Sequence, residues 1–217
     1  MAEINLLDEY PKLDRDVEAR FREVTPEDIR VAKEFGKDFF DGPRIRGYGG
    51  YKYDGRWVKV AEKFAKHYGL TSDSVILDIG CAKGFLMHDF QLVLPGVTVI
   101  GIDVSQYALD KAMPDVKKWC LHGNARDLPF PGDFFDFVVS LATVHNLPRE
   151  ECKQALSEIQ RVSRGKAFIT VDAYRNDVEK DRLKKWVLTA ETYMHVDEWK
   201  EFFAEAGYTG DYYWFIP

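Results

Sequence analysis

A short buried strand followed by a glycine turn is the part of this sequence best suited to hold a cofactor. Residues 75–79 form an apolar run interrupted only by Asp78, and Gly80 and Gly84 enclose the turn that follows. Glycine is needed where a ligand must approach the backbone without meeting a Cβ atom. The helix expected from Phe85 would offer free backbone N–H groups to an anionic part of that ligand. The segment therefore predicts a cofactor loop at the carboxyl end of a strand.

The spacing of this turn bears on which cofactor it could hold. A dinucleotide fingerprint requires glycine at its first, third and sixth positions, the last for close packing of the helix on the strand. Those positions are Gly80, Ala82 and Phe85 here, so a nicotinamide cofactor is disfavoured. No Gly-Lys-Ser/Thr follows, which disfavours a phosphate-binding P-loop. Neither of these two nucleotide sites therefore accounts for the loop.

Three further segments could complete a site of this kind. Asp103 ends the second apolar run, about 20 residues after the turn, which is the separation expected for an acid that accepts both ribose hydroxyls. Asn124 and Ala125 follow the third expected strand, where a side-chain amide and a backbone N–H could bind the edge of an adenine. A fourth expected strand, residues 135–140, runs into Leu141. Ligands of open α/β sheets bind at the carboxyl ends of the strands, so we expect these segments to lie together.

The four segments, in this order, resemble the class I S-adenosylmethionine-dependent methyltransferases over roughly residues 72–175. The resemblance implies an enzyme that uses S-adenosylmethionine as its cofactor. It also implies the cofactor contacts: the methionine part on Asp78, Gly80, Cys81, Ala82 and Gly84, the ribose on Asp103, the adenine on Asn124 and Ala125, with Val104 as a further contact and Leu141 nearby. The sequence departs from the family pattern at Ala82, where glycine is usual, and at Asn124, where aspartate is common.

The activity implied is in-line displacement of the methyl group by an oxygen, nitrogen or carbon nucleophile of a small-molecule substrate. Two other uses of the same site stay open, namely transfer of a different group from the sulfonium and a non-catalytic binding or scaffold role. The aromatic residues expected to cover the site favour catalysis over a scaffold role.

His145, just after the fourth strand, is the candidate catalytic residue. A histidine here could act as a general base on a hydroxyl or amine nucleophile near neutral pH. The alternative is a loop histidine hydrogen-bonded to the backbone. We expect Tyr174 on the same open side, facing the substrate. Because a sulfonium is already activated, methyl transfer does not depend on such a base.

Residues 44–57, the Tyr-rich segment, have the most unusual local composition, with tyrosines, glycines and basic residues interleaved. We interpret this segment as a lid in which Tyr48 and Tyr51 wall the substrate site and Arg46 or Arg56 pairs with a carboxylate. That carboxylate could belong to an anionic substrate or to the methionine end of the cofactor. The alternative is a solvated connector. A lid with glycine hinges would suit a reaction that must exclude water.

The elements that must position these residues alternate between strand and helix after residue 74. This predicts an α/β fold with a doubly wound, Rossmann-like and mostly parallel sheet. Strands are expected at residues 75–79, 97–102, 118–121, 135–140, 166–171 and 212–216. The family sheet ends in a hairpin of its sixth and seventh strands, but only one terminal strand is apparent here. We therefore expect either a missing seventh strand or an unrecognised strand near residues 186–189.

The residues before the sheet predict a helical extension. Thr25 and Pro26 begin a helix expected to run to about Phe40. A second helix is expected from Gly55, with Gly69 as its stop. We therefore divide the chain into an N-terminal helical extension with a lid, residues 1–54, and a cofactor-binding domain, residues 55–217.

The bulk composition narrows the partners and the compartment. The formal net charge of −6 argues against a broad nucleic-acid surface, so we expect no nucleic-acid partner. Three cysteines without a CxxC pair predict neither disulfides nor a metal site. The sequence has no signal peptide and no apolar run near the roughly 20 residues that span a bilayer, which predicts a cytoplasmic protein without a membrane partner. The oligomeric state is left open.

Overall fold

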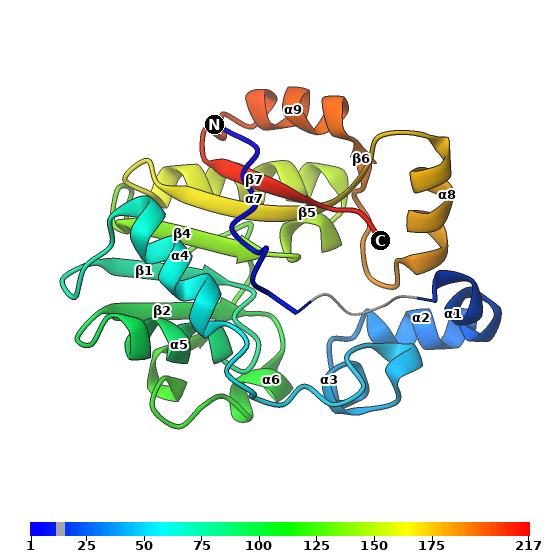
Figure 1. The fold of residues 1–217 in the computed structure, drawn as a ribbon, viewed down its shortest axis with the longest axis horizontal. Helices are drawn as coiled ribbons and strands as arrows, with labels where there is room; N and C mark the ends of the chain where they lie inside the picture. Colours follow the sequence, from blue (N-terminus) through cyan, green and yellow to red (C-terminus); the bar gives the residue numbers. More distant parts are fainter. Residues whose placement is uncertain (12–15) are drawn as a thin grey trace.

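A parallel sheet of seven strands forms the centre of the molecule and separates two layers of helices (Figure 1). The computed structural model describes residues 1–11 and 16–217. The strands are β1 (Val75–Ile79), β2 (Thr98–Asp103), β3 (Cys120–His122), β4 (Phe137–Leu141), β5 (Ala167–Tyr174), β6 (Met194–His195) and β7 (Asp211–Phe215). Their order is β3-β2-β1-β4-β5-β6, with β7 also paired to β5, and every pairing is parallel. The order reverses between β1 and β4, which is where ligands of such sheets bind.

Two hydrophobic cores hold the helices to the two faces of the sheet. The helices are α1 (Val17–Glu23), α2 (Pro26–Ala32), α3 (Lys37–Asp41), α4 (Val58–Tyr68), α5 (Phe85–Val93), α6 (Gln106–Asp110), α7 (Arg149–Val162), α8 (Asp177–Trp186) and α9 (Val196–Glu205). Short 3₁₀ turns occupy Arg44–Arg46, Lys117–Trp119 and Val144–Asn146. One core joins α4, α5 and α6 to Ile76 and Val139, and the other joins α7 and α9 to Leu77 and Val138. Because neighbouring residues of a strand face opposite sides, one strand supplies both cores.

The seventh strand is present, so the expectation that it could be missing is wrong. β7 lies beside residues 168–172 of β5, and the two-residue β6 lies beside Ala173 and Tyr174. No hairpin forms between β6 and β7, since α9 connects them and both run parallel to β5. Residues 187–189 contain no strand. Sequence analysis missed α8, and β6 is too short to produce a periodic pattern.

The helix predicted from Pro26 to about Phe40 is instead two helices, α2 and α3. Thr25 caps α2 as predicted, its hydroxyl accepting from the backbone N–H of Asp28. The chain then leaves the helical region at Phe35, whose φ is +48°, and α3 starts after Gly36. A left-handed residue cannot continue a right-handed helix. After this break, Phe40 of α3 packs with Ala82 of the glycine turn and Ala108 of α6.

The chain before residue 55 has two parts, a segment that lies against the sheet and a group of three helices beside it. Residues 2–4 lie along β7, where the backbones of Ile4 and Tyr212 are hydrogen-bonded, and the chain then crosses in front of the sheet (Figure 1). Helices α1 to α3 form a cap beside the carboxyl ends of the strands, and α1 packs on α8 (Figure 1). Residues 12–15 of the predicted extension lie outside the described residues. The domain division at residues 54 and 55 stays a prediction.

Candidate functional site

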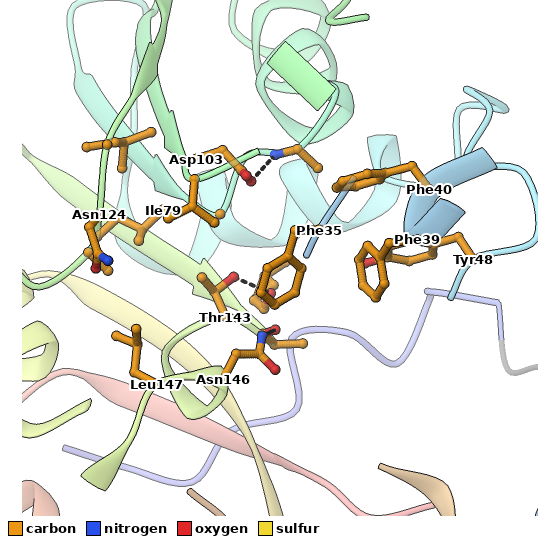
Figure 2. A pocket seen from close by; sticks show the side chains of 18 residues that line it. Phe35, Phe39, Phe40, Tyr48, Ile79, Asp103, Asn124, Thr143, Asn146 and Leu147 are labelled. Carbon is orange, nitrogen blue, oxygen red and sulfur yellow. Dashed lines mark hydrogen bonds between the residues drawn. The ribbon is translucent and has the colours of Figure 1, made fainter. Parts of the chain in front are cut away.

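A cavity of about 120 Å³ lies at the carboxyl ends of β1, β2 and β4. Asp103, Asn124 and Ala125 line its sheet side, and Phe35, Phe39, Phe40 and Tyr48 line it from the cap, as Figure 2 shows for the labelled residues. The predicted residues Val104, Leu141, Gly80 and Ala82 also line it. We call this space the first cavity. It brings together residues predicted to bind a ribose and an adenine.

The carboxylate of Asp103 is positioned by two backbone N–H groups. Oδ2 accepts from Ala82 at 2.8 Å (Figure 2), and Oδ1 accepts from Ser105 at 2.7 Å. Burial raises the pKa of Asp103, and these hydrogen bonds act against that rise. Each oxygen keeps a further lone pair. The carboxylate can therefore still accept hydrogen bonds from a pair of hydroxyl groups.

Asn124 is held by its own loop. Its side-chain oxygen accepts from the backbone N–H of Arg126 at 3.1 Å. The amide NH₂ group makes no hydrogen bond with another described residue. Asn124 can therefore present both donor and acceptor capacity to a heterocycle, as the predicted adenine contact requires.

A second cavity, of about 670 Å³, lies on the other side of the glycine turn. Asp78, Gly80, Cys81 and Ala82 form its inner end. The Asp78 side chain is buried, and no described residue donates a hydrogen bond to it. Burial, with a smaller contribution from nearby Asp103, raises the pKa of Asp78 to about 7. A buried carboxylate without a partner is costly, so a cationic ligand group would relieve this position.

The two cavities meet at a strained junction. Gly80, Ala82, Leu141 and Ala142 line both of them. Ala82 and Ala142 have φ values of +49° and +51°, which non-glycine residues rarely adopt. A Cβ atom on Gly80 would lie only 2.0 Å from Oγ1 of Thr143. Strain of this kind persists where the surroundings over-determine it, and it concentrates at ligand sites. One elongated ligand could extend through both cavities.

The Tyr-rich segment walls the second cavity with aromatic rings. Tyr48, Tyr51 and Trp57 line it, and the ring centroids of Tyr48 and Tyr51 are 4.4 Å apart. Tyr51 also stacks on Phe85, the first residue of α5, at 4.7 Å. The stacked rings bring the segment against the start of the helix that follows the glycine turn. This placement agrees with the interpretation of the segment as a lid, which stays a prediction.

Lys83 ties the Tyr-rich segment to the glycine turn. Its buried ammonium donates to both carboxylate oxygens of Asp41 at 2.7 Å and to the backbone oxygen of Tyr51 at 2.8 Å. Asp41 also accepts from the hydroxyl of Tyr107 at 2.8 Å and the backbone N–H of Tyr51 at 3.1 Å. Sequence analysis missed this network, because Asp41 and Lys83 are far apart along the chain and no local pattern pairs them.

Most of the residues predicted for the site line one cavity or both. They are Tyr48, Tyr51, Asp78, Gly80, Cys81, Ala82, Asp103, Val104, Asn124, Ala125 and Leu141. Gly84 lines neither cavity; it lies at the N-terminus of α5 with φ +72°, and a Cβ there would lie 2.8 Å from Cγ2 of Val116. Its role in the structure is therefore the turn itself. The functional assignment of each residue stays a prediction.

His145 is buried behind the site and lines neither cavity. Its Nδ1 accepts from the backbone N–H of Asp172 at 3.0 Å, so the ring proton is on Nε2, 3.6 Å from Oδ1 of Asp172. Burial lowers the pKa of His145, although the Asp172 carboxylate opposes this. The arrangement is that of the alternative interpretation, a histidine bonded to the backbone. A general-base role for His145 has no support from this geometry.

The arginines expected to bind a carboxylate are paired with aspartates of this chain. Arg46 donates to Asp28 and to Asp38, both at 2.8 Å. Arg56 donates from Nε to both oxygens of Asp54, at 2.8 and 2.9 Å. Neither arginine lines the first or the second cavity. The structure therefore does not place them where a substrate or a cofactor carboxylate would lie.

Tyr174 also lies outside both cavities. Its ring packs on His195, and the ammonium of Lys180 lies 5.0 Å from the ring centroid. The next residue, Arg175, does line the second cavity, as do Tyr10 and Phe215. Arg175 could have been found in the sequence, because residues just after a parallel strand lie at the ligand-binding edge. Tyr10 carried no comparable signal.

Two classes of site are absent from the described part of the chain. No group of three or more histidine, cysteine or acidic side chains there could hold a metal ion. No helix among these residues is long and apolar enough to cross a membrane.

Comparison with known proteins agrees with the geometry. Residues 76–166 match the family model of a methyltransferase domain. A tRNA (carboxymethyluridine(34)-5-O)-methyltransferase of Arabidopsis thaliana is 33% identical over 146 residues, which cover 66% of this chain and 34% of that protein. A demethylmenaquinone methyltransferase of Symbiobacterium thermophilum is 35% identical over 131 residues, covering 55% and 50%. The chain thus spans about a third and a half of these two relatives.

Solved structures share the fold. The YcgJ protein of Bacillus subtilis superposes with a TM-score of 0.55, at 19% identity over 70% of this chain and 68% of that one. At this identity the likeness concerns the Rossmann-like architecture alone. It confirms the predicted fold class.

The expectation of no nucleic-acid partner is wrong as an exclusion, because tRNA methyltransferases are among the relatives. That expectation was based on the net charge of −6. Net charge averages the whole surface, whereas phosphate recognition needs only a local cluster of basic residues. Charge therefore does not decide the substrate class of this fold.

Proposed function

Because this chain belongs to the class I S-adenosylmethionine-dependent methyltransferases, we propose that it transfers a methyl group to an oxygen, nitrogen or carbon nucleophile held in the second cavity. The observation that carries this proposal is that the two cavities share lining residues at the glycine turn and at the end of β4. The first cavity contains Asp103, which can accept hydrogen bonds from hydroxyl groups, and Asn124, which can bind a heterocycle. The second contains the buried, unpaired carboxylate of Asp78. The relatives are named for a tRNA nucleoside and for demethylmenaquinone, so both a nucleic acid and a small molecule are candidate acceptors.

The residues present fit S-adenosylmethionine. Asp103 retains acceptor capacity for two ribose hydroxyls, and Asn124 and Ala125 could frame the adenine. The orphaned carboxylate of Asp78 would face the α-ammonium group of the methionine end, together with Gly80 and Ala82. Of the described residues that line the cavities, only Asp78 and Asp103 carry carboxylates. Each therefore has a matching group in the cofactor.

The contribution of the protein would be to orient the reactants and exclude water. When bound, S-adenosylmethionine supplies a methyl group on a sulfonium, which needs no further activation. Leu141 and Ala142, at the junction of the cavities, would fix the line along which the nucleophile approaches. Tyr48 and Tyr51 would cover this line and keep water out. Orientation of this kind can supply on the order of 7–11 kcal/mol of a reaction barrier.

S-adenosylhomocysteine should bind to this protein at least about tenfold more tightly than NAD. Phe85 occupies the position where a dinucleotide site needs close helix packing, and the donor and acceptor pattern fits an adenosine with a cationic tail. Isothermal titration calorimetry with each ligand is the measurement. Tighter binding of NAD would refute the proposal.

Asp103→Ala should weaken S-adenosylhomocysteine binding about ten- to a hundredfold, because a charged acceptor of two ribose hydroxyls is lost. Asp127→Ala is the matched control, since Asp127 is exposed and lines neither cavity. Calorimetry on both variants, with thermal unfolding to confirm that each is folded, gives the answer. An unchanged dissociation constant in folded Asp103→Ala would remove this residue from the cofactor site.

A further inference from the structure

The outer end of the second cavity is built by elements other than the cofactor loop. β4 ends at Leu141, in register with Thr170, but β5 continues to Tyr174. Arg175 therefore lies about 16 Å along the strand direction from Thr170, at about 3.3 Å per residue. Asp78 is on β1, two strands away. This outer end is thus distinct from the place proposed for the cofactor.

The walls of this outer end are largely aromatic. Tyr10, from the N-terminal segment, and Trp57, from the Tyr-rich segment, meet with ring centroids 4.4 Å apart. Tyr213 and Phe215 come from β7, whereas Tyr51, which also lines the cavity, lies toward the glycine turn and stacks on Phe85. Alternate residues of β7 face opposite sides, so Tyr212 and Trp214 are buried in the core, although Trp214 also borders the cavity. Rings arranged in this way offer a broad apolar surface to a planar ligand.

Arg175 is the one cation among the described residues that line this cavity. Its guanidinium lies 3.5 Å from Glu3 and 3.9 Å from Glu179, and half of its side chain is exposed. Charge-assisted hydrogen bonds are usually about 2.7–2.9 Å long, so neither glutamate holds it closely. Exposed pairs of this kind contribute little to stability. The guanidinium is therefore available to a ligand, unlike those of Arg46 and Arg56.

We propose that Arg175 determines acceptor specificity by pairing with an anionic group on a planar, largely apolar acceptor whose ring lies among the aromatic side chains of the second cavity. The proposal rests on the function proposed above. Guanidinium can bind a carboxylate or a phosphate through two parallel hydrogen bonds, which fixes orientation as well as charge. A ring anchored at this outer end would extend toward the junction at Leu141 and Ala142.

Two fluorescent probes with one carbon skeleton test this charge requirement. 8-Anilinonaphthalene-1-sulfonate is anionic, and N-phenyl-1-naphthylamine is its neutral counterpart. Titrated into protein saturated with S-adenosylhomocysteine, the anionic probe should bind about ten- to a hundredfold more tightly. Arg175→Gln should abolish this preference and Arg175→Lys should keep part of it. Arg22→Gln is the matched control, because Arg22 is exposed on α1 and lines neither cavity.

Several results would overturn the proposal. One is equal affinity of the wild type for the two probes, and another is a preference that survives in Arg175→Gln. An equal loss in Arg22→Gln would assign the preference to general surface charge. Each variant is also titrated with S-adenosylhomocysteine alone, which should bind as in the wild type. If S-adenosylhomocysteine bound to none of the variants, the proposed function would be refuted. That outcome differs from a failure of the Arg175 proposal, in which S-adenosylhomocysteine binds but the probe preference is missing or does not depend on Arg175.

Competition experiments then distinguish two kinds of anionic ligand, aromatic acids and nucleotides. 4-Hydroxybenzoate represents aromatic acids, and uridine 5′-monophosphate represents nucleotides. Displacement of the anionic probe by either competitor from the wild type, but not from Arg175→Gln, supports the proposal and indicates the source. Displacement by neither, at millimolar concentrations, would contradict it.

Discussion

Asp78→Asn is expected to stabilise the fold at pH 8 and to weaken cofactor binding. Burial raises the pKa of Asp78 to about 7, from an ordinary value of 3.8. Between these two values the folded state holds a proton that the unfolded state has lost, so stability falls as the pH rises through this range. An amide removes that penalty. The free energy of unfolding should increase by up to about 4 kcal/mol above pH 7 and change little near pH 4.

The same substitution should weaken S-adenosylhomocysteine binding about ten- to a hundredfold, because the α-ammonium loses its charged partner. In the wild type this affinity should rise between pH 6 and pH 8 as Asp78 ionises, whereas Asp78→Asn should show no such rise. Denaturant unfolding at pH 4 and pH 8 and calorimetry over the same range are the measurements. A variant that is more stable but has a lower affinity for S-adenosylhomocysteine would show that this site favours ligand binding at the expense of stability.

Asp136→Asn is a control for which the expected change in stability at neutral pH has the opposite sign. Asp136 accepts from the backbone N–H of Val75 at 2.8 Å and pairs with Arg164 at 2.7 Å. These contacts hold its pKa below the ordinary value, although burial opposes them. Its carboxylate therefore stabilises the fold at neutral pH, and the amide should be destabilising there. If Asp78→Asn also proved destabilising at pH 8, the buried Asp78 carboxylate would not be a source of instability in the wild type.

Lys83→Met is expected to release the Tyr-rich segment from the glycine turn. The variant loses three hydrogen bonds to Asp41 and Tyr51 and leaves the Asp41 carboxylate without its cation. Breaking a buried pair costs about 3–5 kcal/mol, and the lower end applies because about a quarter of the Asp41 side chain is exposed. We therefore expect local opening to become roughly a hundredfold more frequent.

Hydrogen exchange can detect this opening at particular amides. The backbone N–H groups of Tyr48, Gly50 and Tyr51 donate to the carbonyl oxygens of Phe39 and Phe40, and these should exchange faster. Lys59→Met is the matched control, because it breaks an exposed pair with Glu62 on α4. Unaltered protection of the three amides in a folded Lys83→Met protein would show that Lys83 does not hold the segment.

Local signals in the sequence were enough to locate the elements that carry the cofactor residues. The β1 strand at residues 75–79 has the bounds that the sequence predicts, and α4 ends at Gly69 as expected. Both are defined by patterns within one segment, an apolar run before a glycine turn and an amphipathic period. Asp103 and Asn124 could be placed beside β1 because parallel strands bring their carboxyl ends to one edge. The fold class therefore followed from the sequence, and so did the position of the residues proposed to hold the cofactor.

The acceptor side was decided only by the tertiary structure. Arg46 is neutralised by Asp28, eighteen residues away, and Lys83 pairs with Asp41, forty-two residues away. The walls of the second cavity come from both ends of the chain, Tyr10 and Phe215. Periodicity reports which face of one element is apolar, but it carries no information on which distant side chain neutralises a charge or covers a cavity. Whether Arg46 or Arg175 faces the cavity depends on contacts that exist only when these segments have packed together.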